Sequence, residues 1–169
     1  MLTYMSASRT SNLLGALAVA LTDALTEVTE RGARHGAAAP AALVTIADES
    51  QISIERLRQV LQLSHSGAVR LIDRLAADGL VERQSGRDQR SVSLVLTSAG
   101  RKAAAAVLAE RQAMLGRTLA GLTAAERRSL TPLVEKLLAG VSAGRRSADH
   151  ICRLCNTSVC PLSDCPVLE

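Results

Sequence analysis

The chain contains almost no aromatic residues. Tyr4 is the only aromatic residue among 169, and there is no Phe or Trp. Apolar residues still make up 47% of the sequence, so a core can form, and it must be built from Leu, Val, Ile and Ala. Such a core favours helices. An aromatic cage, a base-stacking platform and an RNA-recognition sheet are excluded, because all three need exposed aromatic rings.

Arginine dominates the charge of the chain. There are 20 basic and 16 acidic residues, a formal net charge of +4 and a pI of about 9.2. Lys102 and Lys136 are the only lysines, so the other eighteen basic residues are arginines. Guanidinium groups are well suited to recognise phosphate and guanine. This charge permits a nucleic-acid partner but does not by itself require one.

No membrane-spanning segment is expected. The longest apolar run near the N-terminus, from Leu13 to Leu21, is too short to cross a bilayer. Arg9 precedes this run, which raises the alternative of a signal peptide, but apolar residues recur at helical spacing as far as Val28. The pattern therefore predicts an amphipathic helix and a cytoplasmic protein, in which thiols stay reduced.

The hydrophobic pattern divides the rest of the chain into helices with one short region of strands. Strands are expected over 80–84 and 92–96, because apolar and polar residues alternate in the second of them. Ser, Thr and Gly residues at the segment ends supply helix caps. Helices are expected from Ser11 or Asn12 to about Arg31, then over 40–49, 54–61, 64–78, 97–119 and 123–141, with a tail after Gly144.

Helices 54–61 and 64–78 are separated by only three residues and form a helix-turn-helix candidate. At about 100° per residue, the second helix carries Ala68, Leu71 and Leu75 on one face and hydroxyl and guanidinium groups on the opposite face. A DNA major groove admits a helix of this kind, with its N-terminal residues nearest the bases. Two short helices also pack together in many other folds. The candidate DNA-contacting residues here are Ser64, His65, Ser66, Arg70 and Arg74.

The hairpin that follows strengthens the case for DNA binding. It carries Arg83, Arg87 and Arg90 within eight residues, against a single acid, Asp88. A glycine-tipped hairpin with arginines can enter the minor groove, whose negative potential attracts guanidinium groups. Arg87 and Arg90 therefore join the candidate DNA-contacting residues.

An ordered set of short motifs runs through this region. It comprises Ser-x-Ser at 64–66, Ile-Asp-Arg-Leu at 72–75, Gly-Leu-Val-x-Arg at 79–83, Asp-x-Arg at 88–90 and Leu-Thr-x-x-Gly at 96–100. In this order the motifs resemble the winged helix-turn-helix of the MarR family, strongly over 53–100 and in layout over 12–143. The sequence departs from the family pattern at Gly67, where a bulkier residue is usual; Gly lowers helix propensity by about 1 kcal/mol relative to Ala.

The resemblance implies a dimeric bacterial transcription regulator and not an enzyme. The implied fold is mainly α with a small β-hairpin wing, a winged helix-turn-helix with long dimerisation helices. Ser66 and Arg70 match family positions that meet the major groove, and Arg90 matches a wing arginine that Asp88 holds in place. The implied partners are a second copy of the chain and double-stranded DNA with an inverted-repeat operator. The implied domain is 1–144, with its DNA-binding part at about 39–97 and dimerisation helices over 12–31 and 98–143.

The effector is left open by this resemblance. Many family members bind small phenolic or lipophilic molecules in a cleft between the dimerisation and DNA-binding parts. In this chain that cleft would lack aromatic walls, so the family's ligand is not carried over.

All four cysteines lie in the tail, 145–169, at Cys152, Cys155, Cys160 and Cys165. These four cysteines are candidate ligands of a metal ion or a metal cluster, and three interpretations of them stay open. The Cys-Pro pairs resemble ligand loops of iron–sulfur proteins, which makes an iron–sulfur cluster the leading one. The second is a structural or sensing zinc site: tetrahedral zinc is commonly held by four thiolates, but its usual form has two C-x2-C pairs set further apart, and here there is one. Free thiols or reversible disulfides need no cofactor.

The predicted function is therefore a sequence-specific DNA-binding regulator that responds to redox state, iron or another metal through its cysteines. One alternative is the same regulator with a structural zinc site or free thiols and a small-molecule effector. An iron–sulfur electron-transfer protein is a remote alternative, since no other cofactor motif accompanies the cysteines. A protein-interaction module without DNA binding is disfavoured by Arg70, Arg87 and Arg90.

Overall fold

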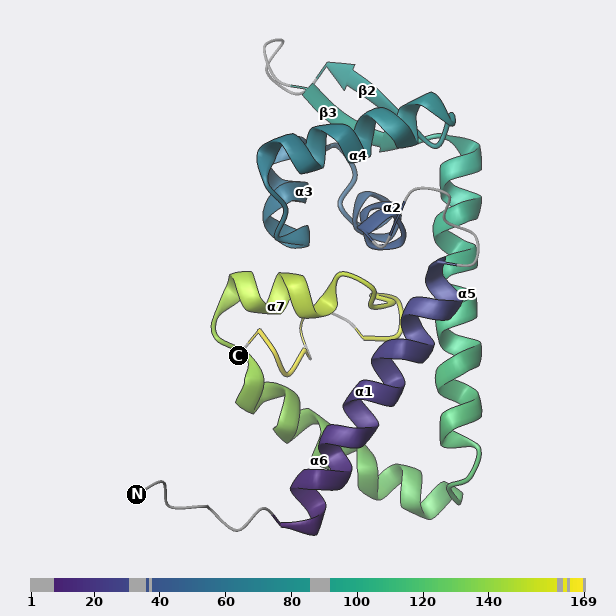
Figure 1. Ribbon diagram of the computed structural model, residues 1–169, viewed down its shortest axis with the longest axis vertical. Coiled ribbons are helices and arrows are strands. Elements are labelled where there is room, and N and C mark those ends of the chain that lie inside the picture. Colours follow the sequence, from purple (N-terminus) through teal and green to yellow (C-terminus); the bar gives the residue numbers. More distant parts are fainter. Residues whose placement is uncertain are drawn as a thin grey trace.

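The fold consists of a winged-helix lobe at one end and long helices that extend away from it (Figure 1). The computed structural model describes residues 8–30, 36, 38–85, 92–160, 163 and 165–168. A three-stranded antiparallel sheet has the order β1-β3-β2. The described elements are α1 (Arg9–Glu30), α2 (Ala38–Asp48), β1 (Ile52–Ser53), α3 (Ile54–Leu61), α4 (His65–Ala77), β2 (Val81–Ser85), β3 (Val92–Leu96), α5 (Ser98–Leu119), α6 (Ala124–Val141) and α7 (Arg145–Cys152).

The predicted fold class is confirmed: the chain is mainly helical, with a small sheet that forms the wing. Two elements were not predicted. Strand β1 has only two residues, Ile52 and Ser53, which is too short to show any alternation. Helix α7 lies in the tail, where only cysteine chemistry was expected. Helix α1 also begins at Arg9, ahead of the expected Ser11 or Asn12, because the Ser8 hydroxyl accepts a hydrogen bond from the Ser11 backbone N–H.

The core of the winged-helix lobe is entirely aliphatic, as the composition requires. The expected packing face of α4 is buried, with Ala68, Leu71 and Leu75 at most 1% exposed. This face of α4 packs against buried residues of α2, α3 and the sheet, so the inner face of α4 is held along its length. The largest fully buried side chains around it are Ile46, Leu57, Ile72, Val81 and Leu94.

The lobe joins the long helix α5 through a tight backbone contact. The Thr97 hydroxyl donates to the Gly79 carbonyl at 2.6 Å, and the Thr97 backbone N–H donates to the Leu80 carbonyl at 3.1 Å. Thr97 also caps α5 by accepting from the Gly100 N–H at 3.0 Å. A Cβ atom at Gly100 would lie only 2.0 Å from the Leu80 carbonyl oxygen. The turn after α4 and the start of α5 therefore lie closer together than any side chain at position 100 allows.

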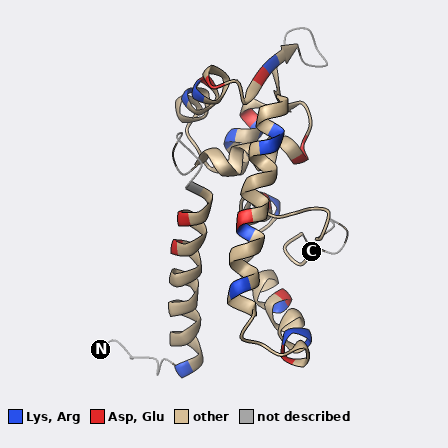
Figure 2. Cartoon of the chain, turned by 90° about the vertical axis from the view of Figure 1, so that its right-hand side faces the viewer, with Lys and Arg blue, Asp and Glu red and all other residues tan. Residues whose placement is uncertain are grey.

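Helix α1 is long and apolar enough to cross a membrane by length and composition alone, a test that signal sequences and core helices also pass. Its apolar side chains are largely uncovered, with Leu13, Leu14, Leu17 and Val19 between 47% and 63% exposed. Figure 2 shows charged residues concentrated elsewhere in the chain and almost absent from most of α1. An apolar stripe this long needs a covering surface that the single chain does not provide.

We predict that Gly100→Ala destabilises the protein even though Ala is the better helix former. Overpacking against a backbone carbonyl costs about 1–3 kcal/mol, which exceeds the propensity gain of about 1 kcal/mol. Gly116→Ala in the same helix is the control, because no atom lies within 4 Å of a Cβ built there. Thermal unfolding should show a lower Tm for Gly100→Ala and an equal or higher Tm for Gly116→Ala. A Gly100→Ala protein as stable as the wild type would contradict this account.

Candidate nucleic-acid interface

The turn between α3 and α4 is built from two helix caps. Helix α3 ends at Gln62, whose backbone is left-handed (φ 54°) and whose N–H reaches back to the carbonyls of the last turn. Two residues later Ser64 starts α4, because its hydroxyl accepts a hydrogen bond from the Gly67 N–H at 3.1 Å. Both caps satisfy backbone groups that a helix end leaves unpaired. The short connection thereby fixes the angle at which α4 leaves α3.

The outer face of α4 presents the residues that the sequence predicted. His65, Ser66, Arg70 and Arg74 are all exposed, opposite the buried face. Arg70 makes no ion pair with any carboxylate in the described part of the chain. Ser64 is exposed too, but its hydroxyl is committed to the cap. The face therefore offers guanidinium, imidazole and hydroxyl groups along one side of a rigid helix.

An ion pair that the sequence did not predict connects the wing to this helix. Arg83 of β2 donates to Asp73 of α4 at 2.7 Å. The sequence shows Asp73 only within the Ile-Asp-Arg-Leu motif and Arg83 only as one of the hairpin arginines. The pair neutralises Arg83 and sets the wing beside α4. The predicted residues Arg87 and Arg90, together with Asp88, lie outside the described residues.

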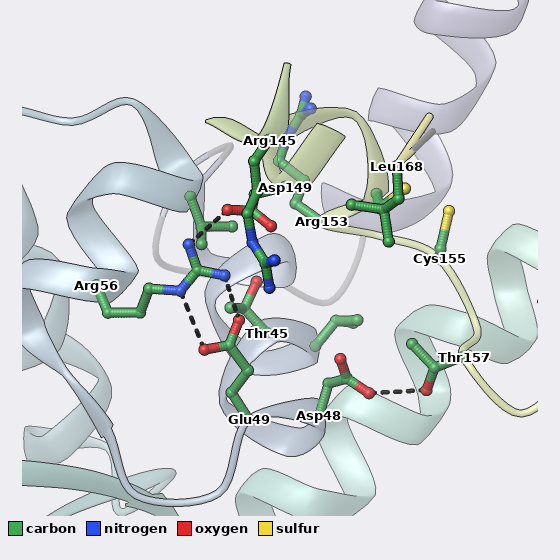
Figure 3. A pocket seen from close by; sticks show the side chains of 13 residues that line it. Thr45, Asp48, Glu49, Arg56, Arg145, Asp149, Arg153, Cys155, Thr157 and Leu168 are labelled. Atoms are coloured by element: carbon green, nitrogen blue, oxygen red, sulfur yellow. Dashed lines mark hydrogen bonds and ion pairs between the residues drawn. The ribbon is translucent and has the colours of Figure 1, made fainter. Parts of the chain in front are cut away.

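The tail packs against the helix-turn-helix, and α7 lies beneath α3 (Figure 1). Arg56 of α3 holds this arrangement together (Figure 3). Its guanidinium donates two bonds to Glu49 at the end of α2, at 2.7 and 3.1 Å, and a further bond to Asp149 of α7. The bonds to Asp149 and Glu49 raise the pKa of Arg56 above its usual value.

Further contacts extend this junction along the tail. The Nδ1 atom of His150 lies 2.9 Å from the Val60 carbonyl oxygen, so this side chain contacts the last turn of α3. The Thr157 hydroxyl donates to Asp48 of α2 at 2.7 Å. A cavity of about 550 Å³ separates the tail from α2 and α3, and Thr45 and Arg153 help to line it. The tail is thus held at several polar points and by Leu154, which packs against the hydrophobic core of the lobe.

Three of the four cysteines come close together. The Sγ atoms of Cys152 and Cys165 are 3.9 Å apart, and Cys165 is buried. Burial, and then the neighbouring sulfurs of Cys155 and Cys165, raise the pKa of Cys152 to about 12. Cys160 is exposed. Among the residues that the structure describes, no group of three or more His, Cys, Asp or Glu side chains is arranged to hold a metal ion. The predicted iron–sulfur or zinc centre therefore stays a prediction.

We predict different roles for two neighbouring serines. Ser64→Ala removes the cap of α4 and should cost about 1 kcal/mol of unfolding free energy. Ser66→Ala is the matched control: its exposed hydroxyl meets only the Ser64 hydroxyl, at 3.3 Å, and accepts from no backbone N–H of the cap, so its effect should stay within about 0.5 kcal/mol. Urea unfolding measures both changes. Equal losses for the two variants would show that the cap is not what stabilises the start of α4.

Comparison with known proteins agrees with this geometry. The family model described as MarR family matches residues 37–91. The solved structure of YusO from Bacillus subtilis is 25% identical, covers 76% of this chain and 91% of its own, and has a TM-score of 0.65. MarR of E. coli in its apo form is 26% identical, with coverages of 74% and 96% and a TM-score of 0.60. A search of curated proteins found no match.

A third structure adds a DNA complex to the comparison. It is described as a MarR family transcriptional regulator from Listeria monocytogenes complexed with a 26-mer DNA. It is 21% identical to this chain, covers 83% of it and 91% of its own length, and has a TM-score of 0.59. MarR family members are transcription regulators and not enzymes. Residues 37–91 of this chain therefore match the MarR family, and the chain as a whole is similar in fold to solved MarR-family structures.

Proposed function

We propose that the chain is a sequence-specific DNA-binding transcription regulator that acts as a homodimer in the cytoplasm. The observation that carries this proposal is the outer face of α4, where His65, Ser66, Arg70 and Arg74 are exposed on a helix whose other face is buried. A helix held in this way can enter the major groove without losing its packing. The DNA complex of the Listeria structure supports the same use of the fold.

The arginines of the interface have different roles in this proposal. Arg70 has no carboxylate partner in the described part of the chain, so its guanidinium is available for a base edge, most favourably the O6 and N7 atoms of guanine. Arg83 is already paired with Asp73 and sets the wing in place. Arg87 and Arg90 are proposed, from the sequence, to supply the minor-groove and backbone contacts.

We expect Arg70→Ala to weaken operator binding by about 1–3 kcal/mol and to relax sequence preference at one position of each half-site. Arg117→Ala, at the far end of α5, is the control, because it removes the same charge from an exposed site away from α4. Binding to the operator and to unrelated DNA, measured at one salt concentration, checks this. If both variants lost the same affinity for both DNAs, Arg70 would act through net charge only.

Dimerisation would cover the apolar surface that the single chain leaves open. Helix α6 exposes Leu133, Leu137 and Val141, by 52–67%, in addition to the stripe on α1. Both helices extend away from the winged-helix lobe (Figure 1). A symmetric dimer through these surfaces would place two recognition helices about one DNA turn, roughly 34 Å, apart. The operator is then an inverted repeat.

Leu17→Glu should break this dimer, because it places a charge in the middle of the apolar stripe of α1. Thr22→Glu adds the same charge to another exposed position of the same helix and is the control. Sedimentation should give twice the 17.7 kDa chain mass for the wild type and the control, and a smaller mass for Leu17→Glu. Footprinting of the wild type should show two symmetric half-sites. A monomeric wild type, or one asymmetric half-site, would refute the dimer.

The close approach of Cys152 and Cys165 favours a second function, regulation of DNA binding through the cysteines. An iron–sulfur cluster would make the protein coloured and would contain iron. A zinc site would be colourless but would contain zinc, and free thiols would contain neither metal. An absorption spectrum and metal analysis of anaerobically purified protein distinguish them. If none of the three centres affects DNA binding, a small-molecule effector is the alternative.

A further inference from the structure

We propose that Cys152 and Cys165 form a reversible disulfide that locks the tail between α6 and the helix-turn-helix. The tail is called the C-terminal strap below and comprises α7 and the segment that follows it, to residue 168. The proposal names the residues and chemistry of regulation, and its DNA-binding readout rests on the function proposed above.

The two sulfurs are already placed for a bond. Their separation of 3.9 Å needs to shorten by roughly 1.9 Å to reach the length of a disulfide. Cys165 lies in a small apolar cluster with Ala148 and Val167, against which Cys152 and Ile151 pack. The cluster therefore holds Cys165 against the end of α7, next to Cys152. Cys160, by contrast, is exposed and is not part of the cluster.

The reaction requires a two-electron oxidant, and a hydroperoxide supplies this. Because the raised pKa of Cys152 keeps that thiol protonated, the thiolate of Cys165 attacks a peroxide oxygen and becomes a sulfenic acid, and the leaving oxygen takes up a proton and departs as water or an alcohol. The second thiol then attacks the sulfenic sulfur, the S–S bond forms and a second water leaves. Two thiols are oxidised and one hydroperoxide is reduced. A low-molecular-weight thiol reverses the step by exchange.

One end of the strap is attached to the long helix α6. The Ser142 hydroxyl, just after α6, donates to the Val167 carbonyl at 2.8 Å. Leu138 of α6 packs against the same apolar cluster that contains Cys165. The segment around Cys165 therefore moves with α6.

The other end of the strap is attached to the DNA-binding lobe. Asp149 pairs with Arg56 near the start of α3, and His150 contacts the Val60 carbonyl near its end, so two side chains of α7 hold α3 at both ends. Cys152 is the last residue of this same helix. A Cys152–Cys165 bond would thus connect the segment around Cys165, which contacts α6, to helix α7, which contacts α3.

The expected consequence is that oxidation restricts how far α3 and α4 move relative to α6. In the reduced protein the strap is held by polar contacts and by Leu154, and a cavity of about 550 Å³ beside these contacts leaves it room to shift. In the dimer proposed above, α6 lies at the subunit interface, so the same restriction fixes the distance between the two recognition helices. Oxidised and reduced proteins should therefore bind the operator with different affinity.

The test uses the full chain, purified anaerobically with a reductant and then treated with hydrogen peroxide. Peptide mass mapping should find a Cys152–Cys165 linkage, lost again on treatment with dithiothreitol. Hydrogen exchange in α7 and in the Val60–Leu63 segment should slow several-fold on oxidation, and operator affinity should change. Cys160→Ser should behave as the wild type, whereas Cys165→Ala should show none of these changes.

The variant Asp149→Asn tests whether the Cys152–Cys165 disulfide acts on α3 through the contact between Asp149 and Arg56. This variant keeps both cysteines but weakens the grip on Arg56, so the disulfide should still form while exchange at Val60–Leu63 and operator affinity respond much less. Thermal unfolding of each reduced variant shows that it is folded. A linkage between other cysteines, iron or zinc bound by these thiols in the purified protein, or equal exchange in both states would overturn the proposal. Absence of DNA binding in both states, with the linkage and slower exchange present, would overturn only the regulator function.

Discussion

The winged-helix lobe depends on the backbone contact at the start of α5. Thr97 and Gly100 grip the turn at Gly79 and Leu80, which is the same turn that ends α4 and begins the wing. The recognition helix, the wing and the long helix therefore meet at one point, and none can rotate without the others. A glycine is required there because a carbonyl oxygen occupies the space of a side chain. This explains physically why a Leu-Thr-x-x-Gly motif opens α5.

With that point fixed, the two sides of the helix-turn-helix serve different purposes. The outer side of α4 is exposed, and its Arg70 guanidinium has no carboxylate partner in the described part of the chain. The side under α3 is occupied by the strap, through Arg56, Glu49 and Asp149. Because α3 and α4 share the buried residues of one aliphatic core, a force applied to α3 from below reaches α4. The cysteines can therefore act on DNA binding from a distance without touching DNA.

The fold was largely predictable because its signals are local. Ser53, Ser64, Thr97 and Thr123 each cap the helix that the sequence indicated, and the alternation in β3 is visible within five residues. The polar face of α4 followed from helical periodicity alone. The placement of Arg83 on Asp73 and of Arg56 between α2 and α7 could not be predicted. Such pairs join residues distant in sequence, and many arginines were available for each acid.

The tail shows the same limit more clearly. Its cysteine spacing indicated reactive or metal-binding thiols, but nothing local showed that Asp149 and His150 would reach α3. Helix α7 has few apolar residues, so its position is set by tertiary contacts rather than by its own hydrophobic pattern. The cysteines could therefore be predicted as candidates for chemistry from the sequence, and the contacts of the tail with α2 and α3 could not.

The ion pair that attaches the strap and the proposed disulfide within it contribute different amounts of free energy. A partly exposed ion pair such as Arg56–Asp149 contributes at most about 1 kcal/mol, although the fork between Arg56 and Glu49 keeps the guanidinium oriented. A disulfide that closes a loop of the size between Cys152 and Cys165 contributes about 3 kcal/mol. These polar contacts and Leu154, which packs on the core of the lobe, attach the strap to the helix-turn-helix, whereas a bond between the two sulfurs would stiffen the strap itself. In the proposed switch the cysteines therefore set how rigid the strap is, and the contacts around Arg56 transmit that restraint to α3.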